Sequence, residues 1–527
     1  MTKLSGEHGS WPRSCALPEL PVPGLNFWDV CMVRTASLRT AIPAVAIIAT
    51  GVICTLGMTG SPSDLLSTPP EVHASHHTLS LTLHAGIASD GKNSFYFDGQ
   101  PNAPTLRFSP GDQLKITYIN DLPVNAKEKC AIMPCMDMTN LHFHGLAVSP
   151  DAPQDDVLDM MAAPGQALHY TVQIPKDHPP GLYWYHTHPH GESHRQALDG
   201  MSGAIVIEGI ESYFPPLAGL PERVLVVRGR SIENDPQSAD LKHRVQLSSD
   251  VCGAEPEMPD EIFTMNGSVR PQIEIASGER QFWRVVNASA DRYLDLQLEG
   301  QTFEIVAMDG MPIAQHDPDH PTRSADHVLL PPAGRVEAIV TGPAAGVSKR
   351  LISRCVDTGP DGDPNPAMVL ADIIPRPGRE STSKMSKSSR KPELKTLDLN
   401  EEEKAPPRFI VIFTEDKKGF YINGEKFAPD AAPMVRAKVG TYQHWRIVNA
   451  SGELHPMHIH QVHFLAYAEN DRRIAEPMWL DTVNVPTGGS VDVIMDFTDP
   501  VIKGTSVFHC HLLNHEDKGM MAKIVFE

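Results

Sequence analysis

A ten-residue pattern recurs three times along this chain of 527 residues, and its spacing sets the size of the folding units. It reads GDQLKITYIN from Gly111, GERQFWRVVN from Gly278 and GTYQHWRIVN from Gly440. Each copy opens with a glycine, continues as an alternating apolar run and closes with an asparagine. The copies begin 167 and 162 residues apart, which suits β-sandwich domains and is too long for a solenoid repeat of about 20–50 residues. The sequence therefore predicts three related domains.

Short runs rich in Val, Ile, Phe and Tyr lie between turn residues along most of the chain. Such runs are typical of strands, so we expect an all-β fold. The predicted domains span residues 75–209, 220–375 and 407–527, after an N-terminal extension over residues 1–74. Residues 376–406 are polar and charged with almost no bulky apolar side chain, which is typical of a surface linker.

The N-terminal extension indicates a protein that works outside the cytoplasm. Arg34 and Arg39 precede an apolar stretch over residues 41–58. This order is typical of a secretory signal or of a single membrane anchor, and the sequence leaves both open. In either case we expect the body of the protein to be periplasmic or secreted. The net charge of −20 without a basic stripe argues against nucleic acid as a partner.

Eight cysteines are present, and an oxidising compartment would allow disulfides among them. The pairs Cys130–Cys135 and Cys252–Cys355 are candidates that sequence alone does not settle.

Four His-x-His pairs occur at equivalent places in the first and third repeats. They are His142/His144, His186/His188, His458/His460 and His509/His511. Residues two apart in a strand point to the same face, so each pair presents its imidazoles together. Eight imidazoles suit copper, exceed the needs of one ion and fit a cluster of three. The second repeat has no such pair around residues 351–354, so we expect its domain to act as a spacer or lid. Two further histidines, His190 and His194, are expected at the rim of the cluster or on the surface.

Cys510 lies between two of these histidines, so its side chain points to the opposite face of the strand. His515 follows five residues later and Met520 ten residues later. A thiolate, an imidazole and a thioether at this spacing belong to the ligand set of a blue-copper site, which has two His and one Cys with a weak axial Met. Thr187 stands at the equivalent place in the first domain, so that domain cannot build such a site.

Together these motifs resemble those of the multicopper oxidases, which include laccases, ascorbate oxidase, bilirubin oxidase and bacterial copper-efflux oxidases. The resemblance covers about residues 75–527, and the ending HCHLLNHEDKGMM is most similar to the three-domain bacterial branch. It implies three cupredoxin-like Greek-key β-sandwich domains and four copper ions, namely one type 1, one type 2 and a type 3 pair. It also implies that four one-electron oxidations of a small reducing substrate are coupled to the reduction of O2 to water.

Carried over motif by motif, the resemblance implies a copper ligand set with no position substituted. The type 1 ligands would be His455, Cys510 and His515, with Met520 axial. The type 2 ligands would be His142 and His458, and the type 3 ligands His144, His186, His188, His460, His509 and His511. His515 would face the substrate, and Cys510 would connect the type 1 site to the cluster through its two histidine neighbours.

Reduction of O2 also consumes protons, and the sequence offers acids to supply them. Glu516 directly follows His515, where similar bacterial enzymes place an acid. The second candidate is Asp155 or Asp156 in the loop SPDAPQDDV, and the choice between them stays open. Asp481 in WLDTV is expected to line the substrate mouth or to cap a turn.

The electron donor is the least constrained part of the predicted function. We favour a laccase-like oxidase of phenols and aromatic amines. The alternative is a metallo-oxidase for Cu(I), Fe(II) or Mn(II), which is suggested by the soft side chains of Cys130, Met133, Cys135, Met136 and Met138. The same residues also suit a disulfide-closed loop with Met as core filler. A cupredoxin-fold binding protein without redox chemistry is disfavoured because every ligand position is retained.

Overall fold

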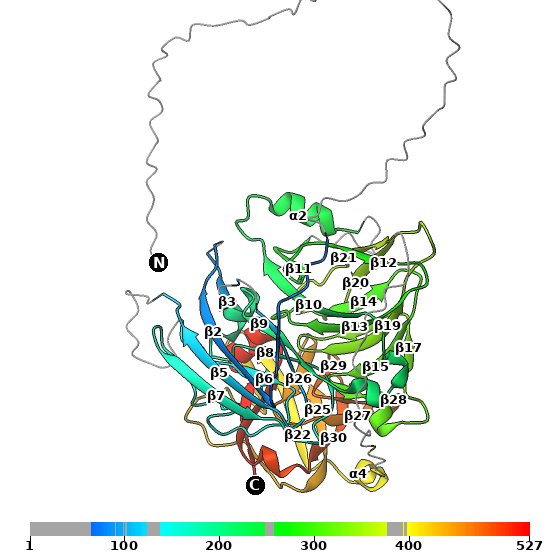
Figure 1. The fold of residues 1–527 in the computed structure, drawn as a ribbon. Coiled ribbons are helices and arrows are strands. Elements are labelled where there is room, and N and C mark those ends of the chain that lie inside the picture. The colour runs from blue at the N-terminus through cyan, green and yellow to red at the C-terminus, as the bar shows by residue number, and fades with distance from the viewer. Residues whose placement is uncertain are drawn as a thin grey trace, which may run out of the picture. The chain divides into compact units, whose positions relative to one another are not determined.

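The computed structural model is described over residues 65–89, 91–98, 100, 103–123, 137–247, 258–376, 394 and 398–527. Within these ranges strands predominate and the helices are short, so the predicted all-β class is confirmed. The strands form three successive pairs of sheets, which we call the first, second and third sandwich (Figure 1).

The first sandwich pairs a sheet of order β1-β4-β9-β8-β6 with a sheet of order β3-β2-β5-β7. Its elements are β1 (Glu71–His73), β2 (Thr78–Ile87), β3 (Asn93–Phe97), β4 (Thr105–Phe108), β5 (Gln113–Asn120), β6 (His142–His144), β7 (Ala167–Gln173), β8 (Gly181–His186), α1 (Ser193–Leu198) and β9 (Ser202–Ile207). Because β1 pairs with β4, this sandwich begins before the predicted boundary at residue 75.

The second sandwich pairs a sheet of order β11-β10-β13-β19-β15-β16, in which β17 also joins β15, with a sheet of order β12-β21-β20-β14-β18. Its helical elements are η2 (Ile210–Ser212), η3 (Pro215–Leu217), α2 (Ser238–Val245) and α3 (Ile313–His316). Its strands are β10 (Glu222–Ser231), β11 (Glu261–Met265), β12 (Gln272–Ile275), β13 (Arg280–Asn287), β14 (Leu294–Leu298), β15 (Phe303–Met308), β16 (Met311–Pro312), β17 (Arg323–Ala325), β18 (Val328–Leu330), β19 (Arg335–Thr341), β20 (Lys349–Arg354) and β21 (Met368–Pro375). Cys355 is disulfide-bonded, whereas Cys130, Cys135 and Cys252 lie outside the described residues.

The third sandwich pairs a sheet of order β23-β22-β25-β30-β27-β28 with a sheet of order β24-β32-β31-β26-β29. Its helical elements are α4 (Asn400–Lys404), η4 (Pro500–Ile502) and α5 (Leu513–Asp517). Its strands are β22 (Phe409–Asp416), β23 (Gly419–Ile422), β24 (Val435–Ala437), β25 (Thr441–Asn449), β26 (His455–Ile459), β27 (Phe464–Glu469), β28 (Arg472–Leu480), β29 (Thr482–Val485), β30 (Ser490–Phe497), β31 (Gly504–Cys510) and β32 (Met521–Phe526). Residues 398–406 were predicted as linker, yet Leu399 is buried and the Ala405 carbonyl oxygen bonds Nδ1 of His444 on β25.

The repeated ten-residue pattern forms the equivalent strand of each sandwich. β5, β13 and β25 each pair in parallel with one neighbour and antiparallel with the other. The closing asparagine donates its side-chain amide to two backbone carbonyls in its own sandwich: Asn120 to Asp137 and Ala162, Asn287 to Arg292 and Leu330, and Asn449 to Glu453 and Val485. The repeat thus fixes a strand and the loops beside it, and it carries no chemistry of its own.

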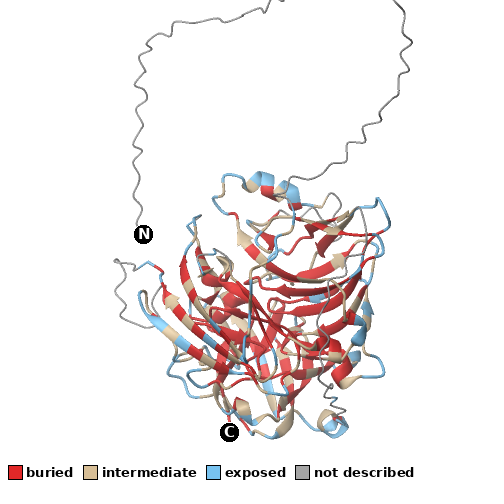
Figure 2. Cartoon of the chain, in the orientation of Figure 1, coloured by how far each residue is buried: buried red, intermediate tan, exposed pale blue. Residues whose placement is uncertain are grey.

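Buried residues run through the interior of the strands (Figure 2), and some of them pack between the sandwiches. Leu182 and Trp184 on β8 pack against Val224 and Val286 of the second sandwich. At a second place one residue from each sandwich meets, namely Ala197, Ala290 and Leu513. These contacts bring the ends of β6 and β8 against the ends of β26 and β31, which carry the paired histidines.

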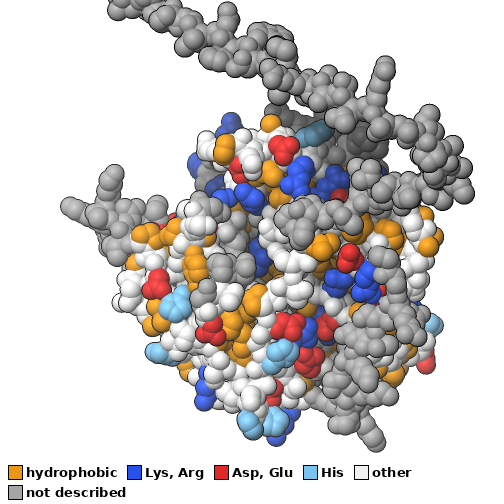
Figure 3. Space-filling model, turned by 45° about the horizontal axis from the view of Figure 1, so that its top comes forward, with side chains coloured by type: hydrophobic (Ala, Val, Ile, Leu, Met, Phe, Trp, Pro, Cys, Tyr) orange, Lys and Arg blue, Asp and Glu red, His pale blue; other side chains and the backbone are white. Residues whose placement is uncertain are grey.

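Among the described helices, none has the length and apolar character needed to cross a bilayer, and residues 41–58 lie outside the described ranges. On the face drawn in Figure 3, Lys and Arg side chains are interspersed with Asp and Glu.

Candidate metal centre

Two strand pairs carry the eight paired histidines to one place in the interior. β6 pairs with β8 so that His142 lies opposite His186, and β26 pairs with β31 so that His458 lies opposite His509. The other members of the pairs follow at or just beyond the same strands, and all eight side chains are fully buried. The structure therefore brings the predicted histidines of the first and third sandwiches into one cluster.

The ring nitrogens of this histidine cluster fall into groups in which all the nitrogens lie within 4.8 Å of one another. One group joins His144, His186 and His511, another joins His188, His460 and His509, and a third joins His142, His144 and His458. Rings also stack across the two sandwiches, His142 on His460 and His144 on His458, with centroids 3.8 Å apart in both cases. Every group draws on both sandwiches, so the cluster exists only where they dock.

Four of these imidazoles are held by an outer contact that leaves the other nitrogen bare. The outer contacts are His142 Nδ1 to the Asp155 carboxylate (3.0 Å), His186 Nδ1 to the Thr187 carbonyl oxygen (2.9 Å), His458 Nδ1 to the Asp481 carbonyl oxygen (2.8 Å) and His144 Nε2 to the Asp481 carboxylate (3.2 Å). The remaining nitrogen of each ring is buried and has no hydrogen-bond partner among the described residues. A buried polar atom without a partner costs about 1–3 kcal/mol, so these atoms fit a bound cation better than a filled core.

Burial keeps the cluster neutral and ready to bind metal. It lowers the pKa of His186 to about 3 and that of His509 to about 4. It also lowers the pKa of the other six imidazoles well below the ordinary value. Nε2 of His509 lies 3.1 Å from Nε2 of His460 and 3.4 Å from Nε2 of His188, so three possible donor atoms converge. Neutral imidazole is a metal ligand that suits copper, and the cluster fits copper ions on this ground.

Cys510 forms a second group with residues on the other face of β31. Its Sγ atom is 3.5 Å from Nδ1 of His455 and 3.9 Å from Nδ1 of His515, and these two nitrogens are 3.4 Å apart. Met520 is fully buried in the same apolar core, and its carbonyl oxygen accepts a bond from the Cys510 N–H. Burial raises the pKa of the Cys510 thiol well above its ordinary value, so a cation beside the sulfur is needed to ionise it.

The two aspartates left open by the sequence differ sharply in surroundings. Asp155 is buried, accepts from the Phe143 N–H and the Gln461 amide, and contacts His142. Burial raises the pKa of Asp155 to about 8, so it holds a proton at neutral pH. Asp156 accepts from two backbone N–H groups of its own loop and has no contact with the cluster in the described structure. Asp155 alone of the pair is placed to act on the cluster.

Glu516 approaches the cluster from α5. Its carboxylate accepts from Ser193 Oγ on α1 at 2.9 Å and lies 3.5 Å from Nδ1 of His188 and 3.4 Å from Nδ1 of His509. Burial raises the pKa of Glu516 well above its ordinary value. The sequence pointed to Glu516 only through its place next to His515, whereas its contacts are with the cluster.

Asp481 does not line a substrate mouth, and neither does it simply cap a turn. It is fully buried, contacts His144 and binds the Arg335 guanidinium through both carboxylate oxygens. Arg335 was not predicted, because its only signal in the sequence is one of two charged residues in the mainly apolar strand RVEAIVT. Arg335 brings the second sandwich into contact with Asp481, and the spacer or lid role of the second domain stays a prediction.

The two extra histidines of the first domain occupy different places. His190 is buried against Phe427, with its ring centroid 6.0 Å from that of His188. Nε2 of His194 pairs with Asp291 at 2.8 Å, and both residues line a cavity beside His515.

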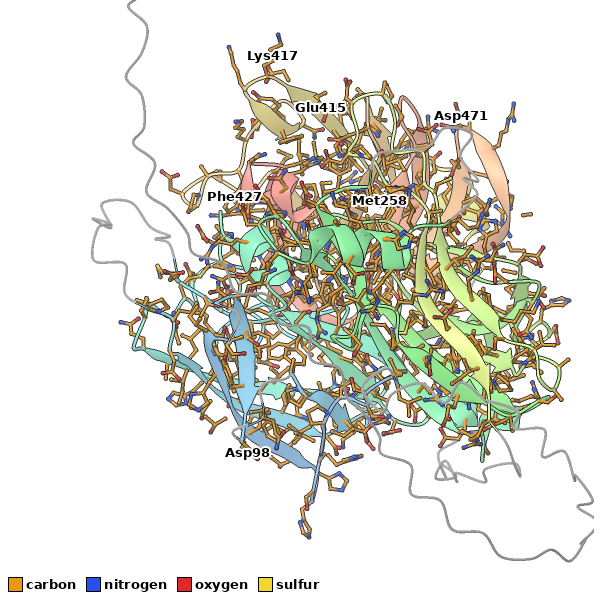
Figure 4. All side chains as sticks on the ribbon, turned by 90° about the horizontal axis from the view of Figure 1, so that it is seen from above. Asp98, Met258, Glu415, Lys417, Phe427 and Asp471 are labelled. Carbon is orange, nitrogen blue, oxygen red and sulfur yellow. The ribbon has the colours of Figure 1, made fainter. Side chains whose placement is uncertain are left out.

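This cavity has a volume of about 320 Å³ and is strongly acidic. Its carboxylates are Glu233, Asp260, Glu261, Asp291, Asp363 and Glu453. Arg292 and His194 are the basic residues that line it, and no Cys or Met appears among its described lining residues. Glu453 Oε1 lies 3.0 Å from Nε2 of His515, so the cavity reaches the cysteine site directly. Glu415, labelled near the β22–β23 turn in Figure 4, adds a further carboxylate 3.9 Å from His455.

Comparison with known protein families gives three matches, each to a model described as "Multicopper oxidase". They cover residues 84–212, 233–347 and 389–527, which together make up most of the chain.

Curated relatives and solved structures agree with these matches. The chain is 25% identical to the multicopper oxidase mco of Staphylococcus aureus, over 83% of this chain and 87% of the relative. It is 26% identical to a laccase of Haloferax volcanii, over 82% of this chain and 77% of the relative. Among solved structures, a multicopper oxidase from Campylobacter jejuni, described as a metallo-oxidase, superposes with a TM-score of 0.65 at 24% identity. That comparison covers 88% of this chain and 95% of the other and shows a shared fold.

Proposed function

The chain belongs to the multicopper oxidase family, and on that premise we propose a laccase-like activity. In this activity a small reducing donor loses one electron at a time, and four such electrons reduce O2 to water. The single observation that carries the proposal is the closeness of two buried groups, the Cys510–His455–His515 group and the cluster of eight histidines. The end of β31 contributes Cys510 to the first group and His509 to the second.

We assign one copper ion to the group formed by His455, Cys510 and His515, with Met520 as the weak axial ligand. The close approach of Sγ and the two Nδ1 atoms supports this assignment. We assign three further ions to the histidine cluster: one to His142 and His458, and a pair to His144, His186, His188, His460, His509 and His511. The bare nitrogens of the cluster support a metal there. Bound copper would supply the electron transfer and O2 chemistry, and the protein would supply geometry and protons.

We assign the proton supply to Asp155 and Glu516. Both carboxyl groups are buried, and burial raises the pKa of both, to about 8 in Asp155. Asp155 touches the imidazole of His142, and Glu516 lies between the imidazoles of His188 and His509. Each acid could therefore pass a proton to the edge of the cluster, and solvent would reprotonate it in each cycle.

We place the donor in the acidic cavity beside His515. A phenol or aromatic amine could bind there by hydrogen bonding to Glu453, whose carboxylate touches His515. The six carboxylates also favour a second candidate, a metal-ion donor. Carboxylate oxygens suit Mn(II) or Fe(II), whereas Cu(I) prefers sulfur ligands. Met138, the one described residue of the Cys/Met segment, is buried in the core. The cavity therefore favours Fe(II) or Mn(II) over Cu(I) within the metallo-oxidase alternative.

We also propose that the enzyme acts outside the cytoplasm, as the apolar stretch over residues 41–58 suggests.

The test is copper loading followed by spectroscopy and O2 uptake. We expect four copper ions per chain, an intense visible band that depends on the thiolate, and O2 uptake with a phenolic dye. A loaded protein without the blue band would contradict the proposal. Parallel assays with Fe(II), Mn(II) and Cu(I) separate the donors. Uptake with Fe(II) or Mn(II) and none with the dye would replace the laccase-like proposal by the second candidate.

A further inference from the structure

Arg335 is a buried charged residue at the edge of the histidine cluster. It belongs to the second sandwich, whose sequence contains no His-x-His pair. Its side chain is fully buried on β19. Nη1 and Nη2 donate to the two carboxylate oxygens of Asp481 at 2.8 and 2.6 Å. Nε donates to the Leu182 carbonyl oxygen on β8, and Nη1 also donates to the Ala333 carbonyl oxygen. One guanidinium therefore binds all three sandwiches at once.

Asp481, held in place by Arg335, contacts two histidines of the cluster. Its carboxylate lies 3.2 Å from Nε2 of His144, and its carbonyl oxygen lies 2.8 Å from Nδ1 of His458. Thr482 Oγ1 contacts both the Asp481 carboxylate and Nδ1 of His458. An anion beside Nε2 favours a proton on that nitrogen, so Nδ1 of His144 keeps its lone pair for the cluster. Asp481 thereby selects the donor atom of His144.

The backbone next to His144 is built around this ion pair. Gly145 has a φ of +82°, and a Cβ atom there would lie 2.6 Å from both Arg335 Nη2 and Asp481 Oδ2. Any side chain at residue 145 would push the guanidinium and carboxylate apart. The glycine that follows the first His-x-His pair therefore serves the Arg335–Asp481 contact.

The repeats show that Arg335 is not part of the common fold. In the equivalent ladders, Ile119 faces Ala167, Val286 faces Arg335 and Val448 faces Ser490. The other two sandwiches thus have a small residue, Ala167 or Ser490, at the position that Arg335 occupies in the second. A buried ion pair is weak evidence for stability, because its desolvation cost is comparable with its Coulomb gain. The presence of Arg335 at this position is better explained by its contact with Asp481, which in turn contacts His144 and His458.

We propose that Arg335 is a positioning residue of the histidine cluster, which fixes the donor atom of His144 and the orientation of His458 through Asp481. The inference rests on the proposed copper cluster. The second sandwich, which contains none of the proposed copper ligands, would then help to orient ligands of that cluster through Arg335.

The chain offers a matched control in Arg284 on β13. Arg284 is equally buried, pairs with Glu337 on β19, and Glu337 in turn accepts from the Leu182 N–H of the first sandwich. No histidine contacts this pair in the described structure. The third repeat has the same arrangement in Arg446 and Asp492, so two of the three sandwiches share this pair.

The experiment compares Arg335→Lys and Arg284→Lys in the full chain. Lysine keeps the charge but cannot make the two-pronged contact. We measure copper release to a chelator, the visible band and the urea stability of the copper-free proteins. Arg335→Lys should release cluster copper roughly 10- to 100-fold faster, as is typical when a group orienting a metal ligand is lost. Its blue band should be unchanged, since no residue of the Cys510 group contacts Arg335 in the described structure. Arg284→Lys should lower stability and retain copper like the unmodified protein.

Two results would overturn the proposal. One is wild-type copper retention in Arg335→Lys, and the other is copper release by Arg284→Lys at the same rate as by Arg335→Lys. If Arg335→Lys does not fold, Asp481→Asn provides the same test with an isosteric change, and retention of all copper by that variant would refute the inference. Failure of the unmodified chain to bind copper would instead refute the proposed function, so the two failures are distinguishable.

Discussion

Acidification should unfold the copper-free protein at a pH where the copper-loaded protein remains folded. Burial lowers the pKa of all eight cluster imidazoles, to about 3 for His186 and about 4 for His509. The unfolded chain therefore takes up protons as the pH falls below the ordinary histidine value of 6.5, whereas the folded chain does not. Because the unfolded state binds more protons, the free energy of unfolding falls as the pH falls.

The size of the effect follows from linkage. Between about pH 7.5 and about pH 5.5, each imidazole that protonates only on unfolding lowers the free energy of unfolding by about 1.4 kcal/mol. The eight imidazoles alone would lower it by up to about 11 kcal/mol. The buried acids Asp155 and Glu453, whose pKa values are raised to about 8 and about 9, bind protons in the folded state and offset part of this loss. Copper binds the folded protein through the same lone pairs and adds its binding free energy to stability. Because the folded imidazoles are neutral with or without copper, the loaded protein should lose a similar amount over this range but start from a higher stability, and so remain folded.

Urea unfolding followed by tryptophan fluorescence, with and without copper across this pH range, measures the effect. His186→Gln removes one of the buried imidazoles and should reduce the acid-dependent loss by about 1.4 kcal/mol. His169→Gln changes an exposed histidine outside the cluster and serves as the matched control. The reasoning is refuted if the acid-dependent loss of stability is the same in His186→Gln as in the unmodified copper-free protein.

Three further predictions concern single side chains. Cys510→Ser should abolish the blue band and leave the cluster copper bound, as measured by visible absorption and metal analysis; a blue Cys510→Ser protein would contradict the ligand assignment. Asp155→Asn should slow O2 reduction by roughly 10²- to 10⁴-fold if Asp155 acts as a proton donor, whereas Asp156→Asn should leave the turnover rate nearly unchanged; equal rates for the two variants would exclude Asp155. Glu453→Gln should raise the KM for Fe(II) or Mn(II) more than the KM for a neutral phenol, and equal changes would argue against a metal donor in the acidic cavity.

The fold was largely predictable because its signals are local and repeated. Alternating apolar residues and the closing asparagine of each repeat report directly on a strand and its hydrogen bonds, as Asn287 and Asn449 illustrate. The histidine pairs were also predictable, since a spacing of two in a strand places both imidazoles on one face. The start of β1 and the contacts of Leu399 were not predicted, because each depends on packing against a distant strand.

The outer partners of the histidines could not be read from the sequence. Arg335 reaches Asp481 across 146 positions of the chain, and Asp481 reaches His144 across 337. Glu453 was overlooked for a different reason, since a loop carboxylate two residues before His455 has no pattern that separates it from a solvated one. Asp155 and Asp156 were indistinguishable as neighbours, and only the contact of the folded loop with β6, where the Phe143 N–H donates to Asp155, places the first of them beside His142.

The two metal groups differ in how much of the molecule they need. The outer nitrogens of the Cys510 group are held within the third sandwich, by Ser451 Oγ for His455 and by Glu453 for His515. Those of the cluster are held by residues of both docked sandwiches and, through Arg335, by the second. Perturbing the contacts between sandwiches should therefore empty the cluster before it affects the Cys510 group. A variant that weakens the apolar seam, such as Val286→Ala, should lose cluster copper while it keeps its blue band, and loss of the blue band first would show that the Cys510 group also depends on docking.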